Sequence, residues 1–161
     1  EQLKRQGLDV TEPHQFKDIG YVRHLSDPEG FQIELLQHTF KGEEKTAVGD
    51  SERPLGGDAF IGQITLRTND IAAELRHYRD ELGMTLLSRQ PVEDYGFELY
   101  FLAFTDDTPP NQNLMSVENR TWLWQRPYTT LEIQHRFDGV AKIRDESRMD
   151  ICFVELVISD R

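Results

Sequence analysis

The stretch Ile61-Gly-Gln-Ile-Thr-Leu-Arg-Thr68, followed at once by Asn69-Asp70, decides the fold class of this chain. Apolar Ile64 and Leu66 alternate with polar residues, as in a strand with one buried face. Asp70 then predicts the start of a helix, because its side chain can accept a hydrogen bond from the free backbone N–H groups of the first turn. The stretch is therefore the strand-to-helix junction of a mixed α and β unit.

A helix and three further strands are expected after this junction. Four apolar residues share one face of the helix, and Gly83 supplies the left-handed conformation that ends many helices. The four residues are Ile71, Leu75, Tyr78 and Leu82. The strands are expected at residues 84–88, 97–104 and 129–136. A Tyr95-Gly96 turn and a polar loop at 105–119 separate them, so residues 59–139 predict a complete unit of order β-α-β-β-β.

Residues 1–40 predict the same unit without its first strand. Its expected elements are a helix end at residues 2–7 and strands at 8–10, 19–25 and 31–37. Asp27-Pro-Glu-Gly30 has Pro and Gly at favoured turn positions and leads into the last of these strands. The two halves therefore form an internal repeat, joined by a polar linker at 41–58.

The carboxy-terminal segment 140–161 contains one more apolar run, at residues 151–159. This strand either pairs beside residues 8–37 and supplies the missing first strand, or begins a further unit after Arg161. We expect the first arrangement, because an exposed apolar strand is an aggregation hazard. The predicted fold class is α+β, with paired βαβββ modules that form curved mixed sheets.

Composition and charge exclude several classes of partner. The 161 residues suffice for one compact domain or two small paired modules, and 18 Lys and Arg against 29 Asp and Glu give a net charge of −11. Such a surface repels phosphate backbones and anionic lipids, so we expect neither nucleic acid nor membrane as a partner. No apolar run is long enough to span a bilayer and no signal peptide opens the chain, so we expect a cytoplasmic protein. The single Cys152 excludes an internal disulfide.

Glu34 and Glu132 occupy the same place in the two repeats, each between aliphatic neighbours. On a strand, each carboxylate points away from those neighbours, so two such strands can direct both carboxylates to one concave surface. Taken singly, each Glu can equally face solvent on an edge strand. Gln63 and Arg67 share one strand face, where Gln63 is either a neutral oxygen ligand or an ordinary polar residue.

Other catalytic motifs are absent from the sequence. There is no His-x-x-x-His pair, no serine nucleophile elbow and no Gly-rich phosphate loop. None of the five histidines has metal-ligand spacing, so we expect them to be structural.

Several segments together resemble the first module of the glyoxalase I family, which belongs to the vicinal oxygen chelate superfamily. The segments are Gly62–Asp70, His77–Arg79, Glu81–Leu87, Leu99–Phe104 and Thr130–His135. Asp27–Leu36 resembles the end of that family's second module, and the resemblance covers most of residues 1–137. It implies a paired-module fold and a small-molecule substrate.

The resemblance also implies a divalent metal ion, zinc or nickel, held by Gln63, Glu132 and Glu34. The implied reaction is that of a metal-dependent lyase or isomerase, which acts on the hemithioacetal of an α-ketoaldehyde and a thiol. Glu34 and Glu132 are then the catalytic carboxylates, with Glu34 as the base. Arg67 matches the arginine that binds a carboxylate of glutathione, so the substrate implied is a glutathione adduct.

A fourth metal ligand and a dimer are further implications. The family takes a histidine from the first strand of the other module. In the carboxy-terminal strand the aligned residue is Phe153, which leaves Glu155, two residues on, as the candidate ligand. Arg136 stands where the family has an asparagine. Members of the family often build the site across a two-fold interface, so we expect a homodimer with Glu34 and Glu132 of one site on different chains.

Two other functions agree with the same sequence. One is another enzyme of the superfamily, such as a ring-cleaving dioxygenase or a thiol transferase. Ring-cleaving dioxygenases use two histidines and one glutamate on iron, and the pair of Gln63 and Glu132 disfavours that set. The other is a metal-free module that binds a flat or cationic small ligand. Metal content and an assay with methylglyoxal and glutathione separate these functions.

Overall fold

The computed structural model describes residues 2–42 and 59–138, together with the backbone of residues 151–158. The elements in chain order are α1 (Gln2–Arg5), β1 (His14–Phe16), β2 (Gly20–Ser26), β3 (Gln32–Gln37), β4 (Ala59–Thr68), α2 (Ile71–Leu75), η1 (Arg76–Glu81), β5 (Thr85–Val92), η2 (Glu93–Tyr95), β6 (Phe97–Ala103), α3 (Glu118–Trp124), β7 (Thr130–Arg136) and β8 (Ile151–Ile158). The predicted α+β class with curved, paired halves is confirmed.

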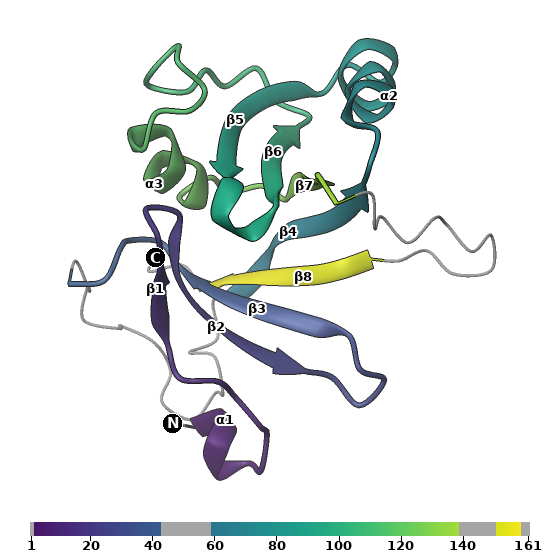
Figure 1. The fold of residues 1–161 in the computed structure, drawn as a ribbon. Helices are drawn as coiled ribbons and strands as arrows, with labels where there is room; N and C mark the ends of the chain where they lie inside the picture. Colours follow the sequence, from purple (N-terminus) through teal and green to yellow (C-terminus); the bar gives the residue numbers. More distant parts are fainter. Residues whose placement is uncertain (1, 43–58, 139–150, 159–161) are drawn as a thin grey trace.

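The described strands form one sheet with a mirrored strand order. The order is β1-β2-β3-β8-β4-β7-β6-β5, and the two central strands, β8 and β4, run antiparallel (Figure 1). On each side a last strand runs parallel to a central one, β3 to β8 and β7 to β4. In register, Glu34 lies opposite Glu155 and Glu132 lies opposite Thr65. The two halves therefore repeat the same pairing about the sheet centre.

Strand β8 lies where the sequence predicted it, beside the strands of residues 8–37. It pairs with β4 on its other edge. We infer that β8 is the first strand of the amino-terminal half and that residues 59–139 form the second half.

The β4-to-α2 junction forms as the sequence predicts. Asp70 caps the helix, because its Oδ1 accepts a hydrogen bond of 3.0 Å from the backbone N–H of Ala73. The last turns widen into a π-helix, η1, and Gly83 ends it with φ of 79°. Leu82 was expected on the buried face but is exposed, because the wider turn of a π-helix rotates later residues away from an α-helical face.

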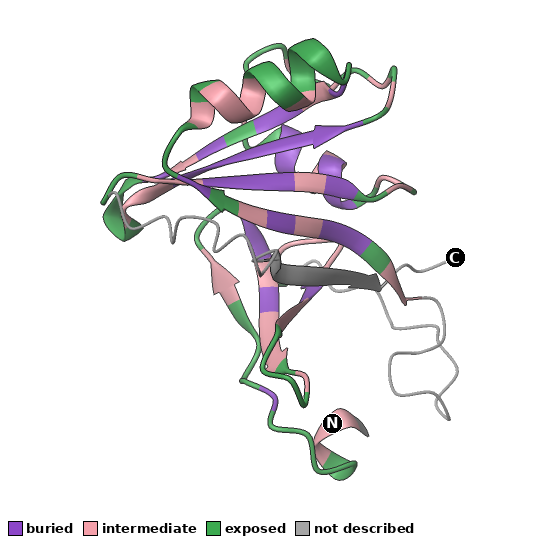
Figure 2. Cartoon of the chain, turned by 90° about the vertical axis from the view of Figure 1, so that its right-hand side faces the viewer, coloured by how far each residue is buried: buried purple, intermediate pink, exposed green. Residues whose placement is uncertain are grey.

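Helix α2 and η1 cover one face of the second half (Figure 2). Three of the predicted apolar residues pack there on the sheet, against a cluster of Met84, Tyr100, Leu102 and Ile133. The three are Ile71, Leu75 and Tyr78. Helix α3 packs on the opposite face of this half, which also lines the cavity described in the next section.

The strand expected at residues 8–10 does not form. Val10 makes only an isolated bridge to Leu25. A tight turn with Lys17 at φ of 48° instead pairs β1 with the start of β2. Opposite Val10, β2 ends one residue beyond Leu25, at Ser26, so residues 8 and 9 find little strand to pair with. The next turn forms as predicted, with Gly30 at φ of 89° and the backbone N–H of Phe31 donating to Asp27 Oδ1 at 2.8 Å.

Helix α3 was not predicted, and it joins the two halves of the core. Its Trp124 is buried, and its ring meets Phe101 edge to face at 5.3 Å. Trp124 Nε1 donates a hydrogen bond of 2.8 Å to the carbonyl of Ile19, next to β2. At Gly20 a Cβ would lie 2.6 Å from Leu36 Cδ1, so the backbone passes close to this core.

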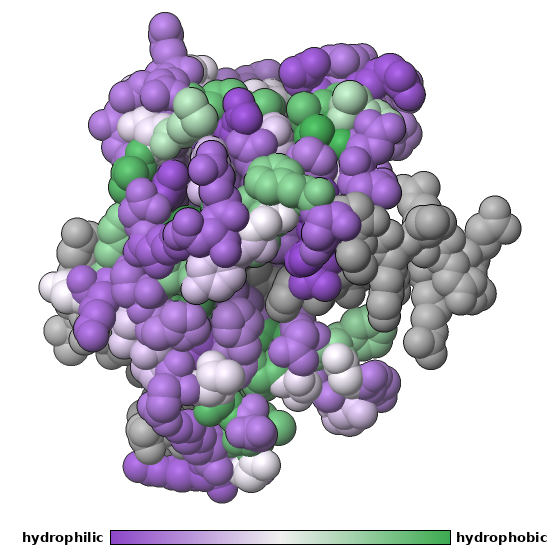
Figure 3. Space-filling model, viewed as in Figure 1, coloured by the Kyte–Doolittle hydropathy of each residue, from purple (hydrophilic) through white to green (hydrophobic). Residues whose placement is uncertain are grey.

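The surface is polar and highly charged. The face in Figure 3 is mostly hydrophilic, with hydrophobic residues in small separated groups, as expected from a net charge of −11. Among the described residues, no helix combines the length and hydrophobicity needed to cross a bilayer.

We predict that Trp124→Phe lowers the free energy of unfolding by about 1–3 kcal/mol, because the Ile19 carbonyl loses its buried hydrogen-bond donor. Urea denaturation followed by circular dichroism measures this change. Trp122→Phe is the matched control, since Trp122 is only partly buried and its ring stacks on Arg126. Equal decreases in the free energy of unfolding of the two variants would show that the hydrogen bond to Ile19 does not contribute to stability.

Candidate functional site

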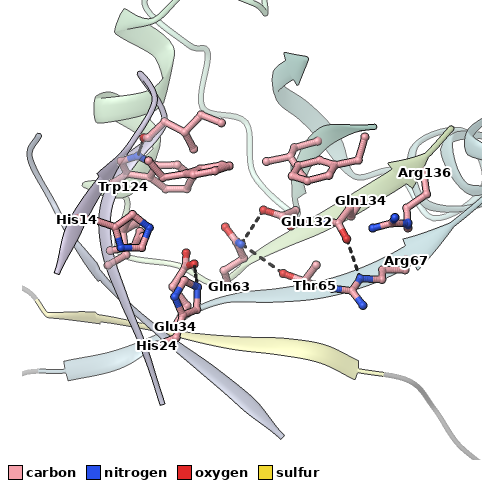
Figure 4. Close-up of a pocket in the computed structure, with 16 residues that line it drawn as sticks. His14, His24, Glu34, Gln63, Thr65, Arg67, Trp124, Glu132, Gln134 and Arg136 are labelled. Atoms are coloured by element: carbon pink, nitrogen blue, oxygen red, sulfur yellow. Dashed lines mark hydrogen bonds and ion pairs between the residues drawn. The ribbon is translucent and has the colours of Figure 1, made fainter. Parts of the chain in front are cut away.

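The curved sheet and α3 enclose a cavity of about 300 Å³. Side chains from both halves line it, including Glu34 from β3, Gln63 from β4 and Glu132 from β7 (Figure 4). The volume is at the lower end of the range for sites that bind small molecules. The cavity is therefore the candidate site of this chain.

Gln63 and Glu132 form the buried polar centre of the cavity. Gln63 is 4% exposed, and its Nε2 donates a hydrogen bond of 2.9 Å to Glu132 Oε2. Thr65, from the same face of β4, lies opposite Glu132 in the sheet register. Gln63 Oε1 is buried and has no hydrogen-bond partner within the described residues. A buried amide oxygen without a donor is unfavourable, so this atom is suited to a ligand that accepts its lone pair.

The environment of Glu132 disfavours its charged form. Burial in the cavity, followed by the negative charge of Glu34, raises the pKa of Glu132 from 4.5 to about 8. Hydrogen bonds from Thr65 and Gln63 and the charge of Arg67 act against this shift. The two carboxylates therefore interact across the cavity, and a cation between them would relieve their repulsion.

Glu34 is paired with a histidine from the neighbouring strand. His24 on β2 lies directly opposite Glu34 in the antiparallel register. His24 Nε2 is 2.6 Å from Glu34 Oε2, and both side chains are about one quarter exposed. The hydrogen bond to Glu34 raises the pKa of His24, and burial opposes this rise. The pair is a charge-assisted hydrogen bond at the edge of the cavity.

One end of the cavity carries two arginines. Arg67 Nε donates a hydrogen bond of 2.7 Å to Gln134 Oε1, and Arg136 pairs with Asp138. Both arginines lie at the end away from His14 and Trp124 (Figure 4). This end is suited to an anionic group of a ligand.

The rest of the lining is apolar and aromatic. Trp124, Phe97 and Phe16 contribute to it, and they come from α3, β6 and β1. The cavity thus combines a carboxylate and amide centre, a cationic end and an aromatic wall. Such a lining suits a small molecule with a polar reacting centre and an anionic tail.

Four of the five predicted site residues line this one cavity: Glu34, Gln63, Arg67 and Glu132. Both carboxylates come from a single chain. The expectation that they belong to different chains was therefore wrong, because β8 connects the two halves into one sheet within the chain. Glu155 lies on β8, opposite both Glu34 and Gln63 in register, and its side chain is outside the described structure.

The sequence did not identify His24 or Gln134 as site residues, although both follow from strand register. The Asp27–Gly30 turn sets the pairing of Ser26 with Gln32, which places residue 24 opposite Glu34. Gln134 lies two residues after Glu132 and thus on the same strand face. Trp124 gave no such signal, because the helix that carries it was not predicted.

Known proteins resemble the chain in sequence and in fold. Over 55 residues it is 47% identical to glyoxalase I of Saccharomyces cerevisiae (strain ATCC 204508 / S288c), covering 34% of this chain and 17% of that protein. Over 86 residues it is 30% identical to lactoylglutathione lyase of Oryza sativa subsp. japonica, covering 53% of this chain and 24% of that protein. The chain therefore spans less than a quarter of these relatives. No family model matches it.

The fold is that of a solved glyoxalase I. The structure of glyoxalase I from Zea mays superposes with a TM-score of 0.52 at 21% identity, covering 84% of this chain and 37% of that one. In sequence, the chain is thus similar to glyoxalase I and lactoylglutathione lyase over part of its length, and it shares its fold with a solved glyoxalase I.

Proposed function

We propose that this chain provides the active site of a metal-dependent lyase or isomerase of glyoxalase I type. The proposed substrate is the hemithioacetal formed by an α-ketoaldehyde and a thiol. The observation that supports it most is the meeting of Gln63, Glu132 and Glu34 in one cavity, where the buried Gln63 Oε1 has no hydrogen-bond partner among the described residues.

The residues fit a divalent metal ion. Gln63 offers an unpaired buried amide oxygen, and Glu34 and Glu132 offer carboxylates that repel each other. Within the described ranges, no group of three or more His, Cys, Asp or Glu side chains is arranged to hold a metal ion, and the proposed ligand set therefore includes the amide of Gln63. A neutral amide and two carboxylates are hard oxygen ligands, which suit hard divalent ions best, and carboxylate oxygens also bind zinc. Glu155 is the candidate for a fourth ligand by its register position.

When bound, a divalent ion would act as a Lewis acid that makes the substrate C–H bond more acidic. The carboxylate of Glu34 then removes the proton from the carbon that bears sulfur and hydroxyl, and returns it to the adjacent carbonyl carbon. The hydroxyl proton passes to the former carbonyl oxygen, so that the first carbon becomes the thioester carbonyl and the second carries the hydroxyl group. The product is a 2-hydroxy thioester, and the step is an isomerisation that needs no oxidant. Glu132 binds and orients the reacting centre, and the aromatic wall excludes water from it.

Arg67 is the proposed binding residue for a carboxylate of the thiol. It lies at the cationic end, where Gln134 orients its guanidinium by the 2.7 Å hydrogen bond. Arg136 adds a second guanidinium at the same end. A thiol with a free carboxylate, such as glutathione, agrees with this arrangement. The homodimer and the cytoplasmic location stay predictions.

We predict that the protein loaded with zinc or nickel converts methylglyoxal and glutathione into a thioester. The ultraviolet absorbance of the thioester measures the rate of this reaction. Glu34→Gln should lower kcat at least about 100-fold, because an amide cannot accept the substrate proton. Glu29→Gln removes an exposed carboxylate of the nearby turn and is the control. Absence of thioester with the loaded wild-type protein would contradict the proposed activity.

Gln63→Leu should weaken binding of zinc at least about tenfold, because it removes one oxygen ligand. Calorimetric titration of the metal-free protein measures the affinity. Gln90→Leu is the matched control, since Gln90 is also fully buried with an unpaired Oε1 but does not line the cavity. If the two variants bind zinc equally well, Gln63 is not a ligand.

The raised pKa of Glu132 predicts a pH-dependent stability of the metal-free protein. The folded state holds the proton up to about pH 8, whereas the unfolded state releases it near 4.5. The proton on Glu132 therefore contributes fully to the free energy of unfolding below pH 4.5. This contribution falls by about 1 kcal/mol per pH unit as the pH rises, and it is lost at about pH 8. Urea unfolding of wild type against Glu132→Gln isolates this contribution, and saturating zinc should abolish it. A constant difference between the two proteins across this range would refute the assignment.

A further inference from the structure

We propose that His24 is a positioning residue for the carboxylate of Glu34: its Nε2 holds Oε2 and leaves Oε1 for the metal ion or for the substrate proton. This inference rests on the proposed function and adds a residue to its site. It begins from the register of β2 and β3, which places His24 directly opposite Glu34. The two side chains meet at 2.6 Å at the edge of the cavity (Figure 4).

Glu34 needs such a partner, because the side chains described around it leave its carboxylate free to rotate. Its side chain is about one quarter exposed, whereas Glu132 is enclosed. A glutamate has three rotatable side-chain bonds, and the partly exposed position of Glu34 allows its carboxylate to turn toward solvent. Within the described residues, the side chain of Glu34 forms a hydrogen bond with His24. That bond therefore keeps the carboxylate turned into the cavity.

The pairing of the two halves explains why the partner comes from β2. In the second half, Glu132 lies opposite Thr65 in the register and accepts a hydrogen bond from Gln63. Gln63 lies two residues before Thr65 on the same strand. In the first half the register partner of Glu34 is Glu155, and the residue two before it is Phe153. Phenylalanine has no hydrogen-bond donor to offer a carboxylate. The hydrogen-bond partner of Glu34 comes instead from β2, the strand on the other side of β3, and it is His24.

Two substitutions at residue 24 separate the hydrogen bond from the ring. His24→Phe keeps an aromatic ring of similar size and removes the donor, and His24→Gln keeps a donor amide near the position of Nε2. We expect His24→Phe to weaken zinc affinity about 10- to 100-fold in calorimetric titration, the range found when a hydrogen bond to a metal ligand is lost. At saturating zinc it should lower kcat at least about tenfold with little change in KM. His24→Gln should stay within about threefold of wild type in both.

His77→Phe is the control for the loss of a His–Glu pair as such. His77 lies 3.0 Å from Glu81 on the exposed surface of η1, outside the cavity. We expect it to keep wild-type zinc affinity, and thermal unfolding of all variants reports whether they fold. Wild-type affinity and kcat in His24→Phe would overturn the proposal. Equal losses in His24→Phe and His24→Gln would overturn it as well, because the imidazole ring and not the hydrogen bond would then be required.

A second measurement needs neither metal nor activity. Long-range ¹H–¹⁵N spectra of the metal-free protein should show His24 Nε2 protonated and slow to exchange, and Glu34→Leu should abolish that signal. Failure of the wild-type protein to bind zinc, with the signal present, would refute the proposed function alone. Absence of the signal in the folded wild-type protein would overturn the role of His24.

Discussion

The antiparallel pairing of β4 with β8 is the constraint on which the site depends. Glu132 on β7 and Glu34 on β3 lie on either side of these two strands. In a flat sheet, three strand spacings would separate them by about 14 Å. Both line one small cavity and the charge of Glu34 acts on Glu132, so the sheet must curve strongly across its centre. Curvature at the β4–β8 pair thus converts two distant carboxylates into one site.

The parts of the fold that could be predicted are those with strong local signals. The cap at Asp70, the stop at Gly83 and the turn at Asp27–Gly30 each depend on the conformation of a few adjacent residues. The wrong predictions concern segments whose structure depends on distant partners or that are short. Residues 8–10 form no strand because β2 ends one residue beyond the partner of Val10, and α3 is too short to give a clear helical period.

Strand alternation and the family resemblance were sufficient to predict those site residues that have a definite place on a strand. Glu34, Glu132, Gln63 and Arg67 face one cavity because each has a definite place on its strand. The ion pair of His24 could not be found by metal-ligand spacing, because it depends on the register between two strands. The buried state of Gln63 and Thr65 was also unexpected. Alternation shows which residues share a face, and only the packed structure shows that the polar face is the enclosed one.

The place of β8 in the chain has a consequence for biosynthesis. Its neighbour β3 ends at residue 37, whereas β8 begins at residue 151, so their pairing closes a loop of more than one hundred residues. Parallel pairing over such a separation is slow, since the entropy of closing the loop is lost before contacts compensate it. In a nascent chain that emerges from the ribosome, β4 to β7 can fold first. Until β8 is synthesised, the edge of β3 that pairs with it has no hydrogen-bond partner. During that interval the edge of β3 is open to other chains, and a chaperone that covers extended segments would favour correct assembly.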